Sequence, residues 1–280
     1  MAGVSTKEIK NRIRSMESTR QITKAMEMVA ASKLRRAQAQ VISSRPYFET
    51  LYATINDIVD STRDFSSPYL VSRSGSKALY IVIAGDRGLA GGYNNNVLKL
   101  ACAEMEGKDA KVLPIGKKAV DFFRSRKIPA ITENHAEAAD VSLGDCFSIA
   151  KSVCKAFLAG EYDEIYVAYT NFVSVLSQTP ATLRLLPLIR HTTGREGTIS
   201  SDITYEPSSE EVFDAIIPEY LGGILYGALC ESRAAEQAAR RSAMDSATQN
   251  ADEMIADLSL KFNRARQAAI TNEIIDIVAG

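Results

Sequence analysis

Both ends of this 280-residue chain lack the residues that interrupt helices. There is no glycine between Gly3 and Gly75, and neither glycine nor proline occurs between Gly227 and Gly280. Because glycine and proline mark turns and loops, their concentration in the middle predicts a compact domain there. The two ends are free to form long helices.

The amino-terminal segment has the periodicity of a helix. Ser5 and Glu8 form a capping-box pattern, which satisfies the first backbone N–H groups of a helix. Apolar residues then recur in groups at steps of three and four: Ile9, Ile13, Met16, Ile22, Met26, Val29, Phe48, Leu51, Ile55 and Ile58. We expect a helix from Ser5 to about Val59, roughly 80 Å long at the usual helical rise. Pro46 should kink it without changing its direction.

The carboxyl-terminal segment, from Glu219 to about Val278, predicts a second helix of roughly 90 Å. Its seam positions are rich in small residues: Leu221, Leu225, Ala228, Ser232, Ala235, Ala239, Ala251, Ile255, Leu258, Phe262, Ala265 and Ala269. Small residues let two helices approach closely, so the simplest arrangement is an antiparallel coiled coil of the two ends. The alternative is that each seam contacts a different molecule. Because alanine buries little area, we expect partners around these helices.

The middle of the chain alternates between strand and helix patterns. Four strands are predicted, at Leu79–Ala84, Lys111–Gly116, Glu164–Tyr169 and Thr179–Leu186, with helices from about Asn95, over 117–126 and over 142–158. This alternation predicts a small, mainly parallel, Rossmann-like α/β domain. The predicted organisation is a coiled-coil helix over 1–60, the α/β domain over 77–214 and a coiled-coil helix over 215–280. The polar segment His191–Asp202 is expected to be a mobile loop.

Composition excludes several classes of protein. The 33 basic and 34 acidic residues nearly balance, so neither a strongly basic nucleic-acid binder nor an acidic tail protein is indicated. The longest apolar runs, Leu79–Ala84 and Ile216–Leu229, are too short or too interrupted for a membrane span. The amino terminus lacks an apolar signal region, so we expect the chain to stay in the compartment where it is made.

The segment Gly85–Asn94 lies between a predicted strand and helix, which is where phosphate-binding loops occur. It fits neither the GxxxxGK[ST] nor the GxGxxG pattern, because its glycines are Gly85, Gly88, Gly91 and Gly92. We interpret it as a structural connection, with nucleotide binding as the alternative.

Other chemistry is weakly represented. The four cysteines, Cys102, Cys146, Cys154 and Cys230, include no CxxC pair, and the two histidines stand alone. No zinc site, catalytic triad or cofactor site is therefore predicted, and the cysteines are expected to be core thiols. Adjacent carboxylates at Glu210 and Glu211 are typical of the first turn of a helix.

The first helix is basic, with ten Lys and Arg residues against three Glu between Ser5 and Arg45. This charge fits a solvated face or an acidic protein partner. Nucleic acid is the third alternative, although the aromatic residues that stack on bases are absent there.

Several longer motifs resemble the γ subunit family of F-type ATP synthases. The amino-terminal match is Ile22–Lys33, and the carboxyl-terminal matches are Glu236–Arg240, Ala243-Met244 and Asn263–Thr271. The loop Asp86–Gly92 and the tripeptide Tyr205–Pro207 match in the same order. The similarity extends from about residue 5 to residue 280.

This resemblance implies a non-catalytic rotor that binds no nucleotide or cofactor itself. The family's coiled coil threads the α3β3 head, and its α/β domain contacts the ε subunit and the c-ring. Ion flow, of protons or sodium, then drives ATP synthesis. The implied β-subunit contacts are Lys24, Met26, Arg240, Arg266, Gln267 and Thr271, and the implied apical bearing is Ile274, Ile275, Ile277 and Val278. The expected location is the cytoplasmic face of a bacterial plasma membrane, with the mitochondrial matrix or chloroplast stroma as alternatives.

The sequence departs from the family pattern at a few positions. Arg233, Ala235 and Arg241 replace residues that the family commonly shows, so the local contacts there are not implied by the resemblance. Ala90 replaces a common cysteine without an evident loss.

Overall fold

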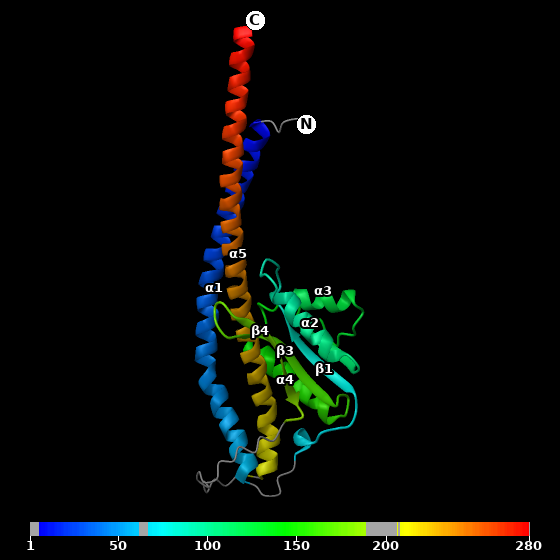
Figure 1. The fold of residues 1–280 in the computed structure, drawn as a ribbon. Coiled ribbons are helices and arrows are strands. Elements are labelled where there is room, and N and C mark those ends of the chain that lie inside the picture. Colours follow the sequence, from blue (N-terminus) through cyan, green and yellow to red (C-terminus); the bar gives the residue numbers. More distant parts are fainter. Residues whose placement is uncertain (1–5, 62–66, 189–205, 207, 280) are drawn as a thin grey trace. The chain divides into compact units, whose positions relative to one another are not determined.

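The computed structural model describes residues 6–61, 67–188, 206 and 208–279. The chain forms two compact units, one from Met1–Ser32 with Arg240–Gly280 (unit 1) and one from Lys33–Ala239 (unit 2). Helices α1 (Thr6–Ser61) and α5 (Ser209–Ala279) each contribute to both units (Figure 1).

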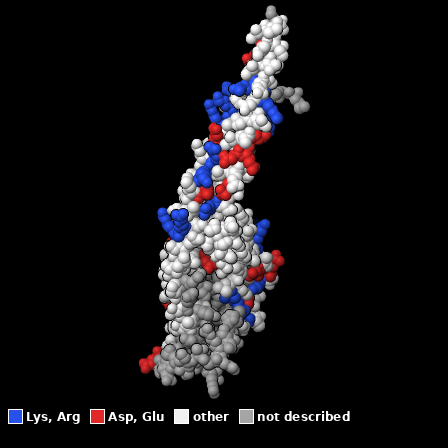
Figure 2. Space-filling view, turned by 60° about the vertical axis from the view of Figure 1, so that its left-hand side comes forward, with Lys and Arg blue, Asp and Glu red and all other residues white. Residues whose placement is uncertain are grey.

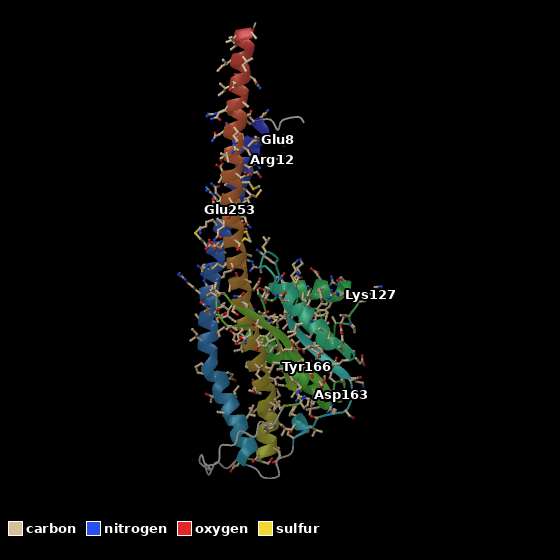
Figure 3. The ribbon with its side chains drawn as sticks, in the orientation of Figure 1. Glu8, Arg12, Lys127, Asp163, Tyr166 and Glu253 are labelled. Carbon is tan, nitrogen blue, oxygen red and sulfur yellow. The ribbon has the colours of Figure 1, made fainter. Side chains whose placement is uncertain are left out.

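Helix α1 confirms the predicted amino-terminal helix. It continues past Pro46 to Ser61, two residues beyond the expected end. Ser5 lies outside the described residues, so the capping box remains a prediction. Glu8 instead forms an ion pair of 2.9 Å with Arg12, one turn further along the helix (Figure 3).

Helix α5 begins earlier than the sequence predicted. Its first residue is Ser209 rather than Glu219, and Pro218 lies inside it. The extra turns are held by tertiary packing, because Phe213 and Ile217 are fully buried in the core of unit 2. Glu210 and Glu211 lie in the first turn, as predicted.

Unit 2 contains a four-stranded sheet in the order β2-β1-β3-β4. Strands β1 (Lys77–Ile83), β2 (Asp109–Ile115) and β3 (Glu164–Phe172) are parallel, and β4 (Gln178–Leu186) is antiparallel to β3. The short connection over 173–177 explains the antiparallel pair, since a parallel crossover needs a dozen or more residues. The mainly parallel α/β fold is confirmed. The predicted loop His191–Asp202 lies outside the described residues.

Helices cover both faces of the sheet (Figure 1). On one face, α2 (Tyr93–Met105) and α3 (Lys117–Ser125) pack against Tyr80 and Val82 of β1. On the other, α4 (Leu143–Leu158) and the first part of α5 pack against Leu79, Ile81 and Ile83. A short 3-10 helix, Pro68–Leu70, adds Tyr69 to this second core.

By length and composition alone, α5 is apolar enough to cross a membrane, with a mean hydropathy of 1.3 over an 18-residue stretch. Of this stretch, 44% is buried inside the structure. Helix α5 carries a core-facing stripe that includes Phe213, Ile217, Leu221 and Leu225, none more than 1% exposed. A core helix of this kind passes the same composition test.

In unit 2 the two long helices pair through small residues of α5, but not at the predicted seam positions, because the seam residue Ala235 packs instead against Ala90 and Tyr93. Leu34 and Ala37 of α1 pack with Ala234 and Ala238 of α5, and all four are buried. Alanine at these positions allows the helix axes to approach closely.

The buried thiols give a direct test of the packing of unit 2. Burial raises the pKa of Cys146 and of Cys154 to about 12, and it also raises the pKa of Cys230. Because the thiolate is the reactive form, these three should resist a disulfide reagent at pH 8, and half-buried Cys102 should react first. Absorbance titration of the folded chain should show one fast thiol and three more only after unfolding. Fast reaction of all four in the folded chain would contradict the packing.

Candidate functional site

The glycine loop after β1 is held by its own side chains. The Gly85 N–H donates to Asn94 Oδ1 at 2.8 Å, and Asn94 Nδ2 donates to the Arg87 carbonyl at 3.2 Å. Gly91 has φ +54, in the left-handed region that favours glycine. These contacts join the end of β1 to the start of α2 and support a structural role for the loop.

Asp86 joins the glycine loop to the N-terminus of α3 and to residues 138–139. Its carboxylate accepts the backbone N–H groups of Lys117 at 3.3 Å, Ala138 at 2.7 Å and Ala139 at 3.1 Å. Lys117 is the first residue of α3, so the helix N-terminus already faces a negative charge of the chain itself. This carboxylate would repel an anion at the N-terminus of α3, whereas the helix that follows the glycine loop is α2, which begins at Tyr93.

Arg233 contacts the same segment from α5. Its guanidinium donates to the carbonyls of Ala138, Ala139 at 3.1 Å and Val141 at 2.8 Å. Asp86 thus binds the N–H groups of residues 138–139 while Arg233 binds carbonyls of residues 138–141. The sequence offered no signal for this role, because Arg233 lies more than 90 residues from its partners.

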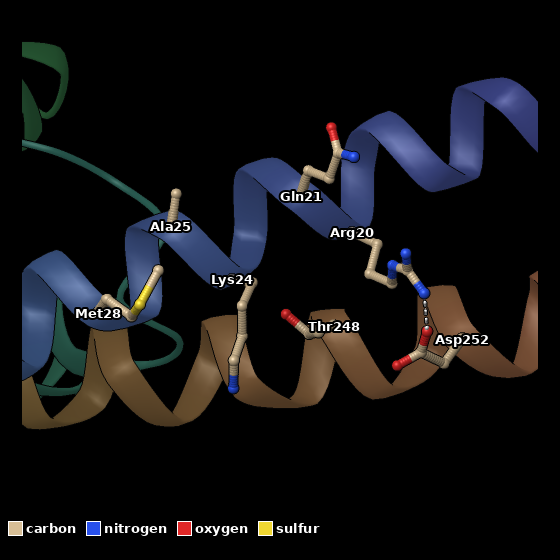
Figure 4. Close-up of a pocket in the computed structure, with 7 residues that line it drawn as sticks. All are labelled: Arg20, Gln21, Lys24, Ala25, Met28, Thr248 and Asp252. Atoms are coloured by element: carbon tan, nitrogen blue, oxygen red, sulfur yellow. Dashed lines mark hydrogen bonds and ion pairs between the residues drawn. The ribbon is translucent and has the colours of Figure 1, made fainter.

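Unit 1 contains a groove between α1 and α5 (Figure 4). Its volume is about 440 Å³, and the side chains that line it are Arg20, Gln21, Lys24, Ala25, Met28, Thr248 and Asp252. Arg20 forms an ion pair of 3.2 Å with Asp252 across the groove. Met28 is 61% exposed, so the groove presents an apolar surface beside cationic groups.

Lys24, a predicted contact residue, lies in this groove. Its ammonium forms a 2.7 Å ion pair with Glu27, and Arg241 approaches the other Glu27 oxygen at 3.9 Å. The hydrogen bond and charge of Glu27 raise the pKa of Lys24, so its amine stays protonated at neutral pH. The other predicted residue of this region, Met26, is half-buried.

The remaining predicted residues lie along α5 in unit 1. Arg240 is half-buried, whereas Arg266, Gln267 and Thr271 are exposed. The apolar residues Ile274, Ile275, Ile277 and Val278 are 56%, 55%, 79% and 81% exposed. In Figure 2 basic and acidic side chains gather along the helices of unit 1, while the last turns of α5 are mostly uncharged.

Within the described ranges, no three His, Cys, Asp or Glu side chains come together where they could hold a metal ion. The fold therefore defines a class of protein in which an α/β domain shares its core with two long terminal helices, and in which exposed helix surfaces are the candidate site.

Comparison with known proteins identifies the family. A family model for ATP synthase matches residues 5–280. The ATP synthase gamma chain of Ruminococcus albus is 47% identical over 277 residues, covering 97% of this chain and 96% of the relative. That of Alkaliphilus metalliredigens is 44% identical, covering 99% and 98%. The chain therefore belongs to the ATP synthase gamma chain family.

The fold agrees with solved relatives. A chain in the Euglena gracilis mitochondrial ATP synthase, from a structure of its OSCP, F1 and c-ring, aligns with a TM-score of 0.68 at 20% identity. The alignment covers 98% of this chain and 92% of that one. As a member of this family, the protein is a subunit of an ATP synthase complex.

Proposed function

We propose that this chain is the non-catalytic central rotor of an F-type ATP synthase. Its α5 end and the groove of unit 1 would contact the α3β3 head, and unit 2 would contact the ε subunit and the c-ring. Support comes from the gamma-chain relatives and from solved structures described as a central stalk with c-ring and as a rotor.

The observation that carries this proposal is the exposed apolar end of α5. Four apolar side chains within five residues are more than half exposed, and the surrounding residues of α5 are exposed as well. A monomeric protein rarely leaves such a surface uncovered. A close-fitting apolar sleeve made by other subunits would cover it while leaving it free to turn.

The cationic residues suit an acidic partner. Lys24 in the groove and Arg266 on α5 are exposed, and Arg240 on α5 is half-buried. We propose these three, with Met26, Gln267 and Thr271, as contacts to β subunits. The nucleotide-binding sites would then belong to the head, and the contacts of Asn94 and Asp86 support a structural role for the glycine loop in this chain.

Membrane association would be peripheral, through the complex. In a bacterium this places the chain at the cytoplasmic face of the plasma membrane. The core-facing stripe of α5 is used inside unit 2, so the proposal requires no span by this helix.

A reversible crosslink tests the rotor. The chain carrying Thr271→Cys is reconstituted with α subunits and with β subunits that carry a cysteine facing this position. Because a covalent link between α5 and a β subunit would prevent turning, ATP hydrolysis should fall in proportion to the crosslinked fraction and return after reduction. Steady-state phosphate release measures this.

The matched control is the chain with Thr271→Cys and unmodified β, which should lose no activity under the same oxidant. Thr271 is exposed and its hydroxyl bonds only the Gln267 carbonyl of its own helix, so the substitution should not disturb folding. Full multi-turnover hydrolysis by a completely crosslinked complex would refute rotation of this end of α5.

A further inference from the structure

Three polar contacts join α1 to α5 along one side of unit 1. Arg20 pairs with Asp252 at 3.2 Å, the hydroxyls of Thr23 and Thr248 lie 2.7 Å apart, and Glu27 faces Arg241 at 3.9 Å. We call these six residues the interhelical polar strip. Three of the four outer side chains are 44–54% exposed and Glu27 is 13% exposed, whereas the central threonines are only 8% and 9% exposed.

The two threonine hydroxyls form a directed chain of hydrogen bonds. Thr23 Oγ1 lies 3.1 Å from the Arg20 carbonyl, and Thr248 Oγ1 lies 2.9 Å from the Met244 carbonyl. The two hydroxyls have one proton each, so they can donate only two of these three hydrogen bonds. One hydroxyl therefore donates across the helices, and the other donates within its own helix. The shorter distance favours Thr23 donating to Thr248, which donates to Met244.

The other buried positions of unit 1 specify the pairing poorly. They are Ile9, Ala30, Met244 and Ala251, all apolar and two of them alanine. Apolar seams of small residues tolerate sliding of one helix along the other, whereas a buried polar contact fixes the register of a coiled coil. We propose that the Thr23–Thr248 contact sets the register of α1 against α5 in unit 1.

If α1 slipped along α5 by one turn, Thr23 and Thr248 would no longer face each other, so this contact distinguishes the observed register from a slipped one. Thr23 would then face Met244 or Ala251–Asp252, and its buried hydroxyl would lose the bond to the other helix. The charged partners would separate by about 5 Å, the pitch of one turn. The Arg20–Asp252 pair is exposed and Arg241 lies 3.9 Å from Glu27, so these ion pairs contribute little by themselves. The hydroxyls of Thr23 and Thr248 therefore contribute most of the preference for the observed register over a slipped one.

The register also positions the groove. Thr248 points toward α1 from the floor of the groove, and the side chain of Lys24 extends across the groove (Figure 4). Lys24 directly follows Thr23 in the sequence. A slip would move Asp252 and Thr248 relative to Lys24 and Met28, and would change the surface offered to a partner. This consequence for coupling rests on the proposed rotor function, whereas the register itself does not.

The test reads the register in the full-length chain. Spin labels are placed at Glu17→Cys on α1 and Glu253→Cys on α5, both exposed, in a chain carrying Cys102→Ser. Pulsed dipolar spectroscopy should give one narrow distance distribution. In the Thr23→Val/Thr248→Val chain, which keeps side-chain shape but removes both hydroxyls, a second population shifted by about one turn should appear.

Two variants separate this role from general destabilisation. Thr23→Ser/Thr248→Ser keeps both hydroxyls and should retain the single distribution. Thr19→Val removes an exposed hydroxyl that bonds only the Ser15 carbonyl of its own helix, and it should change nothing. Circular dichroism monitors helix content, and if the double Val chain loses helix, the two single Val chains are measured, since each removes the cross-helix bond.

An unchanged single distribution in the Val chains would overturn the register proposal. The reconstituted complex provides the second readout: ATP-driven ion pumping per ATP hydrolysed should fall at least twofold in the double Val chain and not in the Ser chain. A shifted register with unchanged pumping would uphold the register contact and remove its consequence for the rotor.

Discussion

Gly116→Ala should lower the free energy of unfolding of unit 2 by about 4 kcal/mol, combining overpacking with backbone strain. Gly116 has φ +95, and a Cβ there would lie 2.1 Å from the Ala84 carbonyl oxygen. The Gly116 N–H also bonds the His135 carbonyl at 2.9 Å, so the backbone cannot move away freely. Urea denaturation followed by circular dichroism measures the loss.

Gly88→Ala is the matched control in the neighbouring loop. No atom lies within 4 Å of a Cβ built at Gly88, and its φ lies outside the left-handed region. The alanine should change stability by less than about 0.5 kcal/mol. Equal losses in the two variants would contradict the close approach of Gly116 to β1.

Arg233→Met should destabilise unit 2 by about 3 kcal/mol, because it removes charged hydrogen bonds to three carbonyls, two of them part-buried, and leaves these acceptors unpaired. Methionine keeps much of the side-chain length, so the loss would reflect the guanidinium rather than a cavity. Hydrogen exchange should accelerate at the Ala138 and Ala139 amides, whose N–H groups donate hydrogen bonds to the Asp86 carboxylate. Thermal unfolding gives the overall loss.

Arg241→Met is the comparison for this prediction. Arg241 is 45% exposed and reaches Glu27 only at 3.9 Å, so its removal should cost less than about 1 kcal/mol. In a double-mutant cycle, Asp86→Ala and Arg233→Met should be non-additive, since both act on residues 138–141. Additive effects would show that the two side chains hold this segment independently.

Periodicity predicted the regular elements well where one physical effect dominates. Both α1 and β1 appear close to the expected bounds. The apolar run of β1 reflects burial on two faces, whereas in the apolar stripe of α1 Ile9 and Ile55 are buried but Ile22 and Val29 are more than half exposed. The predicted start of α5, Glu219, was too late, since the helix begins at Ser209 and contains Pro218, a residue that weakens a helix locally. Burial of Phe213 and Ile217 outweighs that local cost.

The candidate site divides in a similar way. The family resemblance predicted that Lys24, Arg266 and the apolar end of α5 contact other subunits. The structure shows Lys24 in a groove and the end of α5 exposed. These roles remain proposals. The contacts of Arg233 and of Thr23 with Thr248 could not be found from the sequence, because each joins segments more than 90 residues apart.

The sequence by itself determined the long terminal helices, the alternating strands and helices between them, and the family, because these follow from local spacing and extended motifs. Only the tertiary structure decided that Asp86 of the glycine loop binds the N-terminus of α3 and residues 138–139, that Arg233 binds carbonyls of residues 138–141, and that two threonine hydroxyls meet across the helices. Such contacts depend on distance in space, and no spacing along the chain encodes it.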